Sequence, residues 1–298
     1  MLTNINPHSL TSLHNHTIFC DGENDVETMC RAAFEKGLAA VGFSSHAPFE
    51  KTGLKSTWNM KTERLGEYID EVRAARRRWE GKIAVYLGLE VDYVKGLRSP
   101  LDRDLQDIGL DYIIGSVHWL IPPRGAPFTV DGSAAEMEKG VTEGFSGDGE
   151  AMMHAYWDAV AEMIALGGLD IIGHLDLVKK NNTYNESQDR WFKTENSMRR
   201  AGEIAAAVSS AGIVVEVNTG GLNRGYFAET SPSPDILRLL RRQNAPVMIS
   251  ADAHRAGNID GHYSTACRTL LDAGYAGHVV FEGKNGGKPL WREVKLNT

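Results

Sequence analysis

The sequence predicts an α/β barrel in which seven strand-and-helix units surround one pocket. Short apolar runs, nearly continuous in Val, Ile, Ala and Gly, alternate with amphipathic helical stretches. Such runs are typical of parallel strands that are buried on both faces. In addition, each of the seven runs contains His, Asp or Glu at or near its carboxyl end. Because a parallel barrel gathers the carboxyl ends of its strands at one mouth, these polar residues would converge on one pocket.

The units follow one another in a regular order, and each strand-like run precedes a helical stretch. The predicted strands cover residues 12–16, 40–46, 84–92, 112–118, 171–176, 213–218 and 247–254. The predicted helices cover residues 26–36, 61–79, 101–108, 150–166, 195–211, 234–242 and 265–273. The tail, residues 278–281 and 291–296 around Gly286-Gly287, predicts a closing hairpin. Because barrels of this length commonly form one unit, we expect a single domain over residues 1–298.

Two long connections interrupt this order. Residues 122–149 are Gly-rich and show no strong helical or strand period, so we expect a long loop there. Loops of this length often act as lids or binding loops, although disorder is the alternative. Residues 177–194 form the second connection, which contains Lys179, Lys180 and Arg190.

Composition limits the classes of function that the chain can have. Its 298 residues are 42% hydrophobic and 24% charged, as in ordinary soluble proteins. A net charge of −7 argues against a general nucleic-acid or membrane-surface binder. No apolar window is long enough to span a membrane, and no signal peptide is visible at the start. The three cysteines show no CxxC spacing, which favours a reducing cytoplasm over a disulfide framework.

Two pairs of polar residues have the spacing of metal ligands on a strand. His14 and His16 form one pair, and Asp252 and His254 form the other at the far end of the chain. Residues i and i+2 of a strand point to the same face, so both members of a pair can reach one ion. Glu90 lies inside an apolar run, where an unpaired carboxylate would be costly to bury. Metal coordination would remove that cost.

Six short motifs contain these five residues and further candidate ligands. They are His14-Asn15-His16-Thr17 with Asp21-Gly22, Ser45-His46-Ala47-Pro48-Phe49, Gly88-Leu89-Glu90, Gly115-Ser116-Val117-His118, Gly173-His174-Leu175-Asp176 and Ser250-Ala251-Asp252-Ala253-His254. In this order they resemble the motifs of the PHP (polymerase and histidinol phosphatase) superfamily, and the resemblance covers nearly the whole chain. The second and fourth motifs, together with residues 216–222, are most similar to the histidinol-phosphate phosphatase branch.

The resemblance implies a distorted (β/α)7 barrel of the PHP type that holds two to three divalent metals, which would be zinc, iron or manganese. The first metal would be held by His14, His16, Glu90 and Asp252. Glu90 would bridge to a second metal, which His118 and His174 would also hold. The third metal would be held by Asp21, His46 and His254. Glu90, Asp252 and His254 are the expected catalytic residues.

The implied activity is that of a metal-dependent phosphomonoesterase that acts on a small phosphate ester, in histidine biosynthesis. The transition state of phosphate hydrolysis spreads negative charge over phosphoryl oxygens. Clustered divalent ions would neutralise this charge and provide a metal-bound hydroxide as the nucleophile. One alternative is a PHP-type phosphodiesterase or exonuclease, whose substrate would be a nucleotide or short oligonucleotide. A second alternative is a non-catalytic binding module. The acidic composition favours a small phosphate ester over a nucleic-acid substrate.

Five residues are the expected substrate contacts. Lys179 and Lys180 follow the strand that ends in His174, and related phosphatases place a basic residue after that strand. They also place one after the next strand, where Arg224 comes later in the loop than expected. Phe49 and Trp119 lie beside candidate ligands and are expected to pack on the imidazole ring of a substrate.

Two further residues are not expected to take part in the site. Glu216 ends an apolar run, and we interpret it as a structural carboxylate in preference to a ligand. His278 lies outside the motifs and is expected at the surface.

Overall fold

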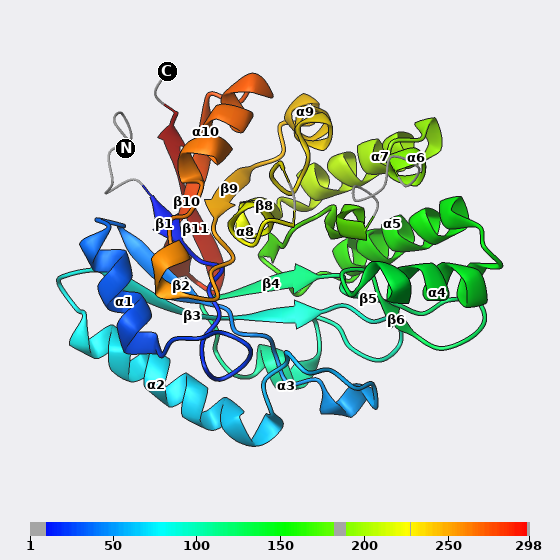
Figure 1. Ribbon diagram of the computed structural model, residues 1–298. Coiled ribbons are helices and arrows are strands. Elements are labelled where there is room, and N and C mark those ends of the chain that lie inside the picture. The colour runs from blue at the N-terminus through cyan, green and yellow to red at the C-terminus, as the bar shows by residue number, and fades with distance from the viewer. Residues whose placement is uncertain (1–9, 182–188, 227, 297–298) are drawn as a thin grey trace.

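Seven parallel strands form one nearly closed barrel in the computed structural model, which describes residues 10–181, 189–226 and 228–296 (Figure 1). The order of the strands around the sheet is β1-β2-β3-β4-β7-β8-β9. They are β1 (Thr11–Ser12), β2 (Ala40–Phe43), β3 (Ala84–Asp92), β4 (Tyr112–Ser116), β7 (Ile171–Ile172), β8 (Val214–Asn218) and β9 (Val247–Ser250). The predicted α/β barrel of seven strands is therefore confirmed.

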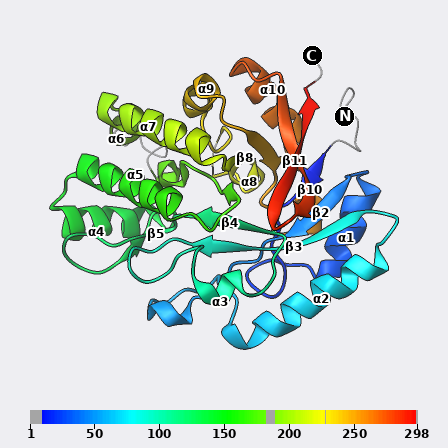
Figure 2. The same cartoon turned by 180° about the vertical axis from the view of Figure 1, so that it is seen from behind.

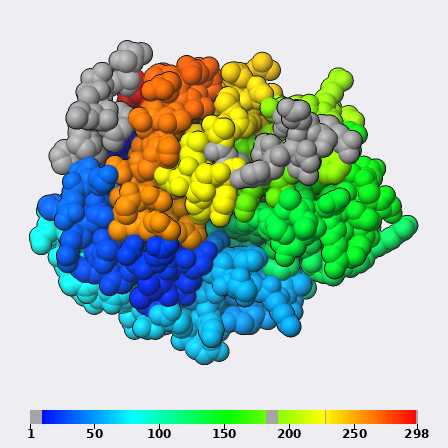
Figure 3. Space-filling model, viewed as in Figure 1, coloured from blue at the N-terminus to red at the C-terminus, as the bar shows by residue number. Residues whose placement is uncertain are grey.

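The barrel closes between its first and last strands through the two outer ligand motifs. Asn15 and Ala253 form an isolated parallel bridge, in which the His16 amide donates to the Ala253 carbonyl at 2.9 Å. The Glu23 amide donates to the His254 carbonyl at 2.7 Å just beyond this bridge. Figure 3 shows the blue segment that follows β1 lying against the orange segment that follows β9. Residues at opposite ends of the chain are thus neighbours at the barrel mouth.

Helices cover the outside of the barrel, where they bury the outward faces of the strands. The long ones are α1 (Val26–Glu35), α2 (Leu65–Arg78), α5 (Gly149–Leu166), α7 (Glu195–Ala211), α9 (Pro234–Arg242) and α10 (Tyr263–Asp272). The short ones are α3 (Arg103–Gln106), α6 (Asp189–Phe192) and α8 (Gly220–Asn223), and 3-10 turns occupy Glu50–Thr52, Thr62–Arg64, Leu177–Asn181 and Ala256–Asn258. Within the described part of the chain, no helix has the length and apolar character needed to cross a membrane.

Several strands end earlier than the apolar runs predict. The run of residues 171–176 contains only the two-residue strand β7, and that of residues 247–254 contains β9 and then leaves the sheet. In each case the chain turns away from the ladder before the ligand residue is reached. Ligand side chains therefore come mostly from the first residues after the strands, and isolated parallel bridges at Asn15–Ala253 and His46–Glu90 still join these segments.

The predicted hairpin is confirmed and covers the amino-terminal end of the barrel (Figure 2). It consists of β10 (Gly277–Asn285) and β11 (Lys288–Lys295). Phe281 of the hairpin packs edge-on against Tyr86 and Tyr112, at centroid distances of 4.8 and 5.8 Å. The expectation that His278 lies at the surface is wrong, because its side chain is only 3% exposed on β10.

The stretch 122–149 is folded, contrary to the expectation of a long loop. The strands β5 (Trp119–Leu120) and β6 (Phe128–Thr129) pair before α4 (Ala134–Phe145) begins. Ser133 and Glu136 form a capping box at the start of α4. Gly140 weakens the helical pattern of the sequence, yet it lets α4 approach Phe128, because a Cβ atom there would lie 2.4 Å from the ring. The capping box was a visible predictor of this helix.

Gly88 is required by the packing of Tyr112 inside the barrel. A Cβ atom at Gly88 would lie 2.6 Å from the Tyr112 ring, whose hydroxyl donates a hydrogen bond to the Leu13 carbonyl. We therefore expect Gly88→Ala to lower the free energy of unfolding by about 1–3 kcal/mol through overpacking. Gly66→Ala is the control, because the space around Gly66 in α2 is open and alanine should stabilise the helix by about 0.5–1 kcal/mol. Denaturant unfolding measures both; equal midpoints for Gly88→Ala and the wild type would contradict this packing argument.

Candidate metal centre

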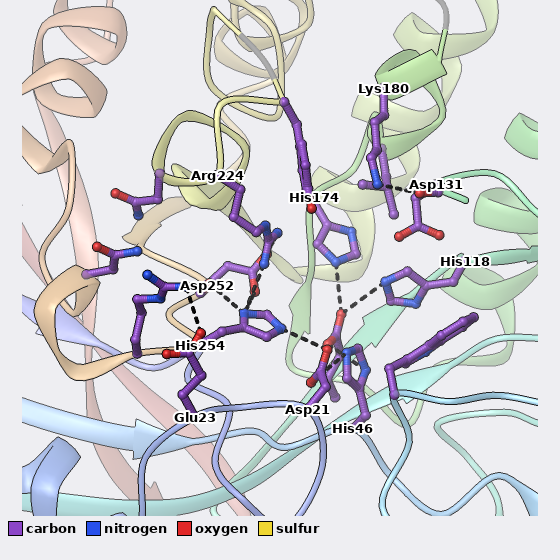
Figure 4. A pocket seen from close by; sticks show the side chains of 17 residues that line it. Asp21, Glu23, His46, His118, Asp131, His174, Lys180, Arg224, Asp252 and His254 are labelled. Atoms are coloured by element: carbon purple, nitrogen blue, oxygen red, sulfur yellow. Dashed lines mark hydrogen bonds and ion pairs between the residues drawn. The ribbon is translucent and has the colours of Figure 1, made fainter. Parts of the chain in front are cut away.

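All nine predicted metal ligands lie close together at the carboxyl ends of the strands. Seven of them line a cavity of about 590 Å³ (Figure 4), and the other two, His14 and His16, are fully buried beside these seven. The nine are His14, His16, Asp21, His46, Glu90, His118, His174, Asp252 and His254. Their donor atoms form four overlapping groups, and within each group the atoms lie within 4.8 Å of one another. One such group combines His16, Asp21, His46 and His254, and another combines Glu90, His118 and His174.

Glu90 lies at the centre of the cluster. Its side chain is 1% exposed and points from β3 into the barrel mouth. One carboxylate oxygen, Oε2, faces three imidazole nitrogens: His46 Nδ1 at 3.0 Å, His14 Nε2 at 3.2 Å and His16 Nε2 at 3.5 Å. The other oxygen, Oε1, faces two more: His174 Nε2 at 2.9 Å and His118 Nε2 at 3.7 Å. A carboxylate with histidines on both oxygens has the arrangement of a bridging ligand.

Two aspartates complete the opposite side of the cluster. Asp252 Oδ1 lies 3.3 Å from His16 Nε2, and Asp21 Oδ2 lies 3.2 Å from His254 Nε2. Asp252 adopts a left-handed backbone conformation with φ of 46°, which is unfavourable for a residue other than glycine. Such strain is commonly found at functional sites, where surrounding structure holds the residue in place.

Two buried carboxylates outside the predicted set orient the histidines. Glu216 Oε1 lies 2.6 Å from His14 Nδ1, and Asp92 Oδ1 lies 2.6 Å from His118 Nδ1. Each interaction leaves the Nε2 atom of the ring directed at Glu90, as in many metal sites where a carboxylate holds a histidine ligand. Sequence reasoning missed Asp92, although its spacing of two residues from Glu90 on β3 places both side chains on one face.

Several buried donor atoms of the cluster fit a bound cation. Among the described residues, His14 Nε2, His16 Nε2, His46 Nδ1 and Glu90 Oε2 have no hydrogen-bond partner. Buried polar atoms without partners are unfavourable, and divalent ions bound within the cluster would satisfy them. The mixture of imidazole and carboxylate donors fits zinc, manganese or iron(II). The residues present therefore fit a site for several metal ions.

Electrostatics favour the protonation states that metal binding needs at Glu90 and His16. By contrast, neighbouring carboxylates outweigh burial and raise the pKa at three other candidate ligands, which are His14, His118 and His254. Burial alone would raise the pKa of Glu90, but His46 and His14 lower that pKa well below its usual range. Burial, reinforced by His254 and His46, lowers the pKa of His16 to about 3. Glu90 is therefore ionised and His16 is neutral near pH 7, and these are the forms that coordinate metals.

Two of the predicted basic residues line the cavity beside the cluster (Figure 4). Arg224 donates a hydrogen bond of 2.8 Å to Asp252 Oδ2, and its guanidinium lies 2.9 Å from His254 Nδ1. Lys180 donates to the main-chain oxygen of Asp131. Both cations also approach the ring of Tyr226, at 4.3 Å for Lys180 and 5.6 Å for Arg224. The cavity thus has positive charge next to its candidate metal ligands.

Lys179 lies outside the cavity, which argues against the predicted phosphate contact. Its side chain is fully buried, and its ammonium contacts the Thr230 carbonyl at 2.6 Å, Asp176 Oδ2 at 3.1 Å and Glu229 Oε1 at 3.2 Å. The 3-10 turn Leu177–Asn181 directs Lys179 and Lys180 to different surroundings. Lys179 thereby ties the loop after β7 to the loop after β8.

Phe49 and Trp119 are also absent from the cavity wall. They are 4% and 8% exposed, and their rings stack on each other at a centroid distance of 5.7 Å. Trp58, which sequence reasoning missed, lines the cavity instead. Its ring stacks on Trp119 at 5.8 Å and lies 6.5 Å from the His118 ring. The position of Trp58 in a strand-to-helix loop was the available sequence indication, because such loops form the mouth of a barrel.

Comparisons with known proteins agree with this geometry. The PHP domain family matches residues 12–220. The probable histidinol-phosphatase of Deinococcus radiodurans is 31% identical over 89% of this chain and 94% of its own. The putative histidinol phosphatase of Listeria monocytogenes superposes with a TM-score of 0.75 at 27% identity, over 86% of this chain and 99% of that one. The histidinol phosphate phosphatase of Lactococcus lactis, solved with zinc, L-histidinol and phosphate, superposes with a TM-score of 0.65 at 20% identity, over 94% and 98%.

The barrel and its multi-metal ligand cluster define a metal-dependent hydrolase. The chain belongs to the PHP domain family, and it is a metal-dependent phosphomonoesterase. The family resemblance predicted from the sequence motifs is thereby confirmed.

The cluster predicts the metal content of the purified protein. We expect two to three equivalents of zinc, manganese or iron per chain by elemental analysis, because the donor atoms form several overlapping groups. Chelation should lower the thermal unfolding midpoint, since a ligand that binds only the folded state stabilises it, and re-addition of metal should restore it. Less than one equivalent after reconstitution with each of the three metals would contradict the cluster.

Proposed function

We propose that the protein hydrolyses histidinol phosphate to histidinol and inorganic phosphate, in histidine biosynthesis. The observation that carries the proposal is the position of Arg224 and Lys180, which line the same cavity as seven of the nine candidate ligands. A phosphoryl group in this cavity would lie between metal ligands on one side and two cations on the other. The names of the relatives from Deinococcus radiodurans and Listeria monocytogenes support the choice of histidinol phosphate.

In this proposal the candidate ligands bind the metals, and the two cations of the cavity bind the phosphoryl group. By the family resemblance, His14, His16, Glu90 and Asp252 would hold one metal, Glu90, His118 and His174 a second, and Asp21, His46 and His254 a third. In the structure Asp252 also lies with His14 and His174, and His16 lies with Asp21, His46 and His254. When bound, the metals supply activation of water and neutralisation of the negative charge that develops on the phosphoryl oxygens.

Arg224 would bind a phosphoryl oxygen through its guanidinium, which Asp252 orients through the 2.8 Å hydrogen bond. Lys180 would balance the second charge of a monoester dianion. Its ammonium is held beside the cavity by the Asp131 carbonyl and the Tyr226 ring. A diester carries one charge fewer and a second substituent, so this pair of cations favours monoesters.

The test is a panel of phosphate esters that includes histidinol phosphate and bis(p-nitrophenyl) phosphate, with release of phosphate or nitrophenol as the measurement. We expect the highest kcat/KM for histidinol phosphate. A preference for the diester would require the phosphomonoesterase assignment to be withdrawn.

A cytoplasmic location is also part of the proposal. It is supported by Cys20, Cys30 and Cys267, which are free thiols in the structure.

A further inference from the structure

Asp131 places a carboxylate in the cavity that the metal cluster does not use. It follows β6 in the segment that leads to α4, and it lines the cavity beside His118 and Lys180 (Figure 4). In residues 10–181, 189–226 and 228–296, no group donates a hydrogen bond to its carboxylate; the Lys180 ammonium bonds to its main-chain oxygen. By contrast, Glu23, another acidic residue of the cavity wall, pairs with Arg255 at 2.7 Å.

The backbone around Asp131 is held firmly from both sides. The Val130 amide donates to the His118 carbonyl at 2.9 Å. The Asn181 side chain donates to the carbonyls of Val130 and Gly132, each at 3.1 Å. Asp131 is thus fixed between a candidate metal ligand and the turn that contains Lys180. A carboxylate on such a rigid segment is well placed to recognise a ligand, because little ordering is needed on binding.

The charge of Asp131 shows which part of a substrate it suits. An ionised carboxylate repels a phosphoryl dianion, so its partner must be a positive group. Lys180 lies next to Asp131, so the wall presents a positive and a negative side chain side by side. A substrate that complements this wall has a cation only a few atoms away from its phosphate. A protonated amine on the carbon next to the phosphorylated carbon has this spacing.

We propose that Asp131 is a specificity-determining residue that binds the ammonium group of an aminoalkyl phosphate monoester. The inference rests on the proposed function, because histidinol phosphate carries its ammonium on the carbon adjacent to the phosphorylated carbon. Asp131 binds that ammonium while Arg224 and Lys180 bind the phosphoryl group. Trp58, which also lines the cavity, leaves an aromatic surface for the imidazole ring.

The test compares Asp131→Asn with the wild type on substrates that differ only in the amine. Histidinol phosphate is paired with 3-(imidazol-4-yl)propyl phosphate, which lacks the amino group. Asparagine keeps the volume of the side chain and removes its charge. We expect kcat/KM for histidinol phosphate to fall about 10- to 100-fold, mainly through KM, because one charge-assisted contact is lost. The value for the analogue without the amine should stay within about 3-fold.

Two further variants separate recognition of the amine from general damage. Glu23→Gln removes a different carboxylate from the cavity wall, and it should leave the preference for the amine unchanged. Asp131→Glu restores the charge and should recover part of the preference. The metal content and thermal unfolding midpoint of each variant are measured alongside, and for Asp131→Asn both should match the wild type.

A second pair, phosphoethanolamine and propyl phosphate, keeps the amine spacing without the imidazole. Suppose that the wild type does not hydrolyse histidinol phosphate but prefers phosphoethanolamine to propyl phosphate, and that Asp131→Asn abolishes this preference. The proposed function then fails while the role of Asp131 stands. Equal losses on both members of each pair would overturn the role of Asp131, as would a wild-type enzyme without preference for either amine. Failure of the wild type to hydrolyse either amine would overturn both proposals.

Discussion

Replacing Glu90 by glutamine is expected to lower turnover by orders of magnitude. The two carboxylate oxygens of Glu90 face five imidazoles, three on one oxygen and two on the other. Glutamine keeps the volume but removes the charge that would hold two cations close together. The fold should persist, because the barrel is built from hydrophobic contacts on both sides of the strands. Steady-state kinetics measures the loss of turnover, and elemental analysis of the same sample measures the metal content.

Glu162→Gln is a matched control for this experiment. Glu162 lies on α5 and pairs with Lys95 and Tyr93, outside the cavity wall. Its replacement should leave turnover and metal content close to the wild type. If Glu90→Gln retained more than about a tenth of wild-type turnover, Glu90 would not be a bridging ligand.

Neutralising either cation of the cavity should damage monoester hydrolysis far more than diester hydrolysis. Arg224→Met and Lys180→Met each remove one positive charge beside the ligand cluster. Loss of one charge-assisted contact in a dry site costs about 2–3 kcal/mol, which corresponds to roughly 30- to 150-fold in kcat/KM. A diester carries a single negative charge, so it should lose less. The measurement is the ratio of kcat/KM for histidinol phosphate to that for bis(p-nitrophenyl) phosphate.

Lys179→Met provides the contrast, because Lys179, although adjacent to Lys180 in the sequence, is buried away from the cavity. Its removal leaves Asp176 without its buried partner, so the variant should lose stability. It should not change the preference between monoester and diester. If Arg224→Met and Lys180→Met both left monoester hydrolysis within a few-fold of the wild type, the assignment of these cations to phosphate would be wrong.

Local patterns in the sequence were sufficient to predict most elements of the fold. The bounds of β3, α7 and α9 agree with the predicted ranges, because each is a long, regular segment between clear breaks. The same patterns failed for α4, where Gly140 interrupts the helical period. They also extended several strands too far, since an apolar run does not show where the chain leaves the sheet.

The convergence of the nine candidate ligands was predictable for a different reason. All except Asp21 lie within or just after an apolar run, and parallel strands bring the ends of such runs to one mouth; Asp21, in the loop after the first run, was predicted from the family motif alone. The family resemblance then assigned them to individual metals. Their position in the chain therefore contained most of the information about the site.

Side-chain direction within the loops was decided only by tertiary structure. Lys179 and Lys180 are adjacent in one turn, yet Lys179 is buried against Asp176 and Thr230, whereas Lys180 lines the cavity. Likewise, Trp58 lines the cavity, whereas Trp119 stacks on Trp58 and Phe49 stacks on Trp119, and neither of these two rings lines the cavity.

The sequence by itself determined the barrel, because apolar runs and helical periods are local properties, and its motifs named the candidate ligands through the family resemblance. Which lysine, which tryptophan and which carboxylate face the cavity depends on partners far away in the chain, such as Thr230 for Lys179 and Asn181 for the backbone beside Asp131. Those contacts exist only after the loops have packed on one another.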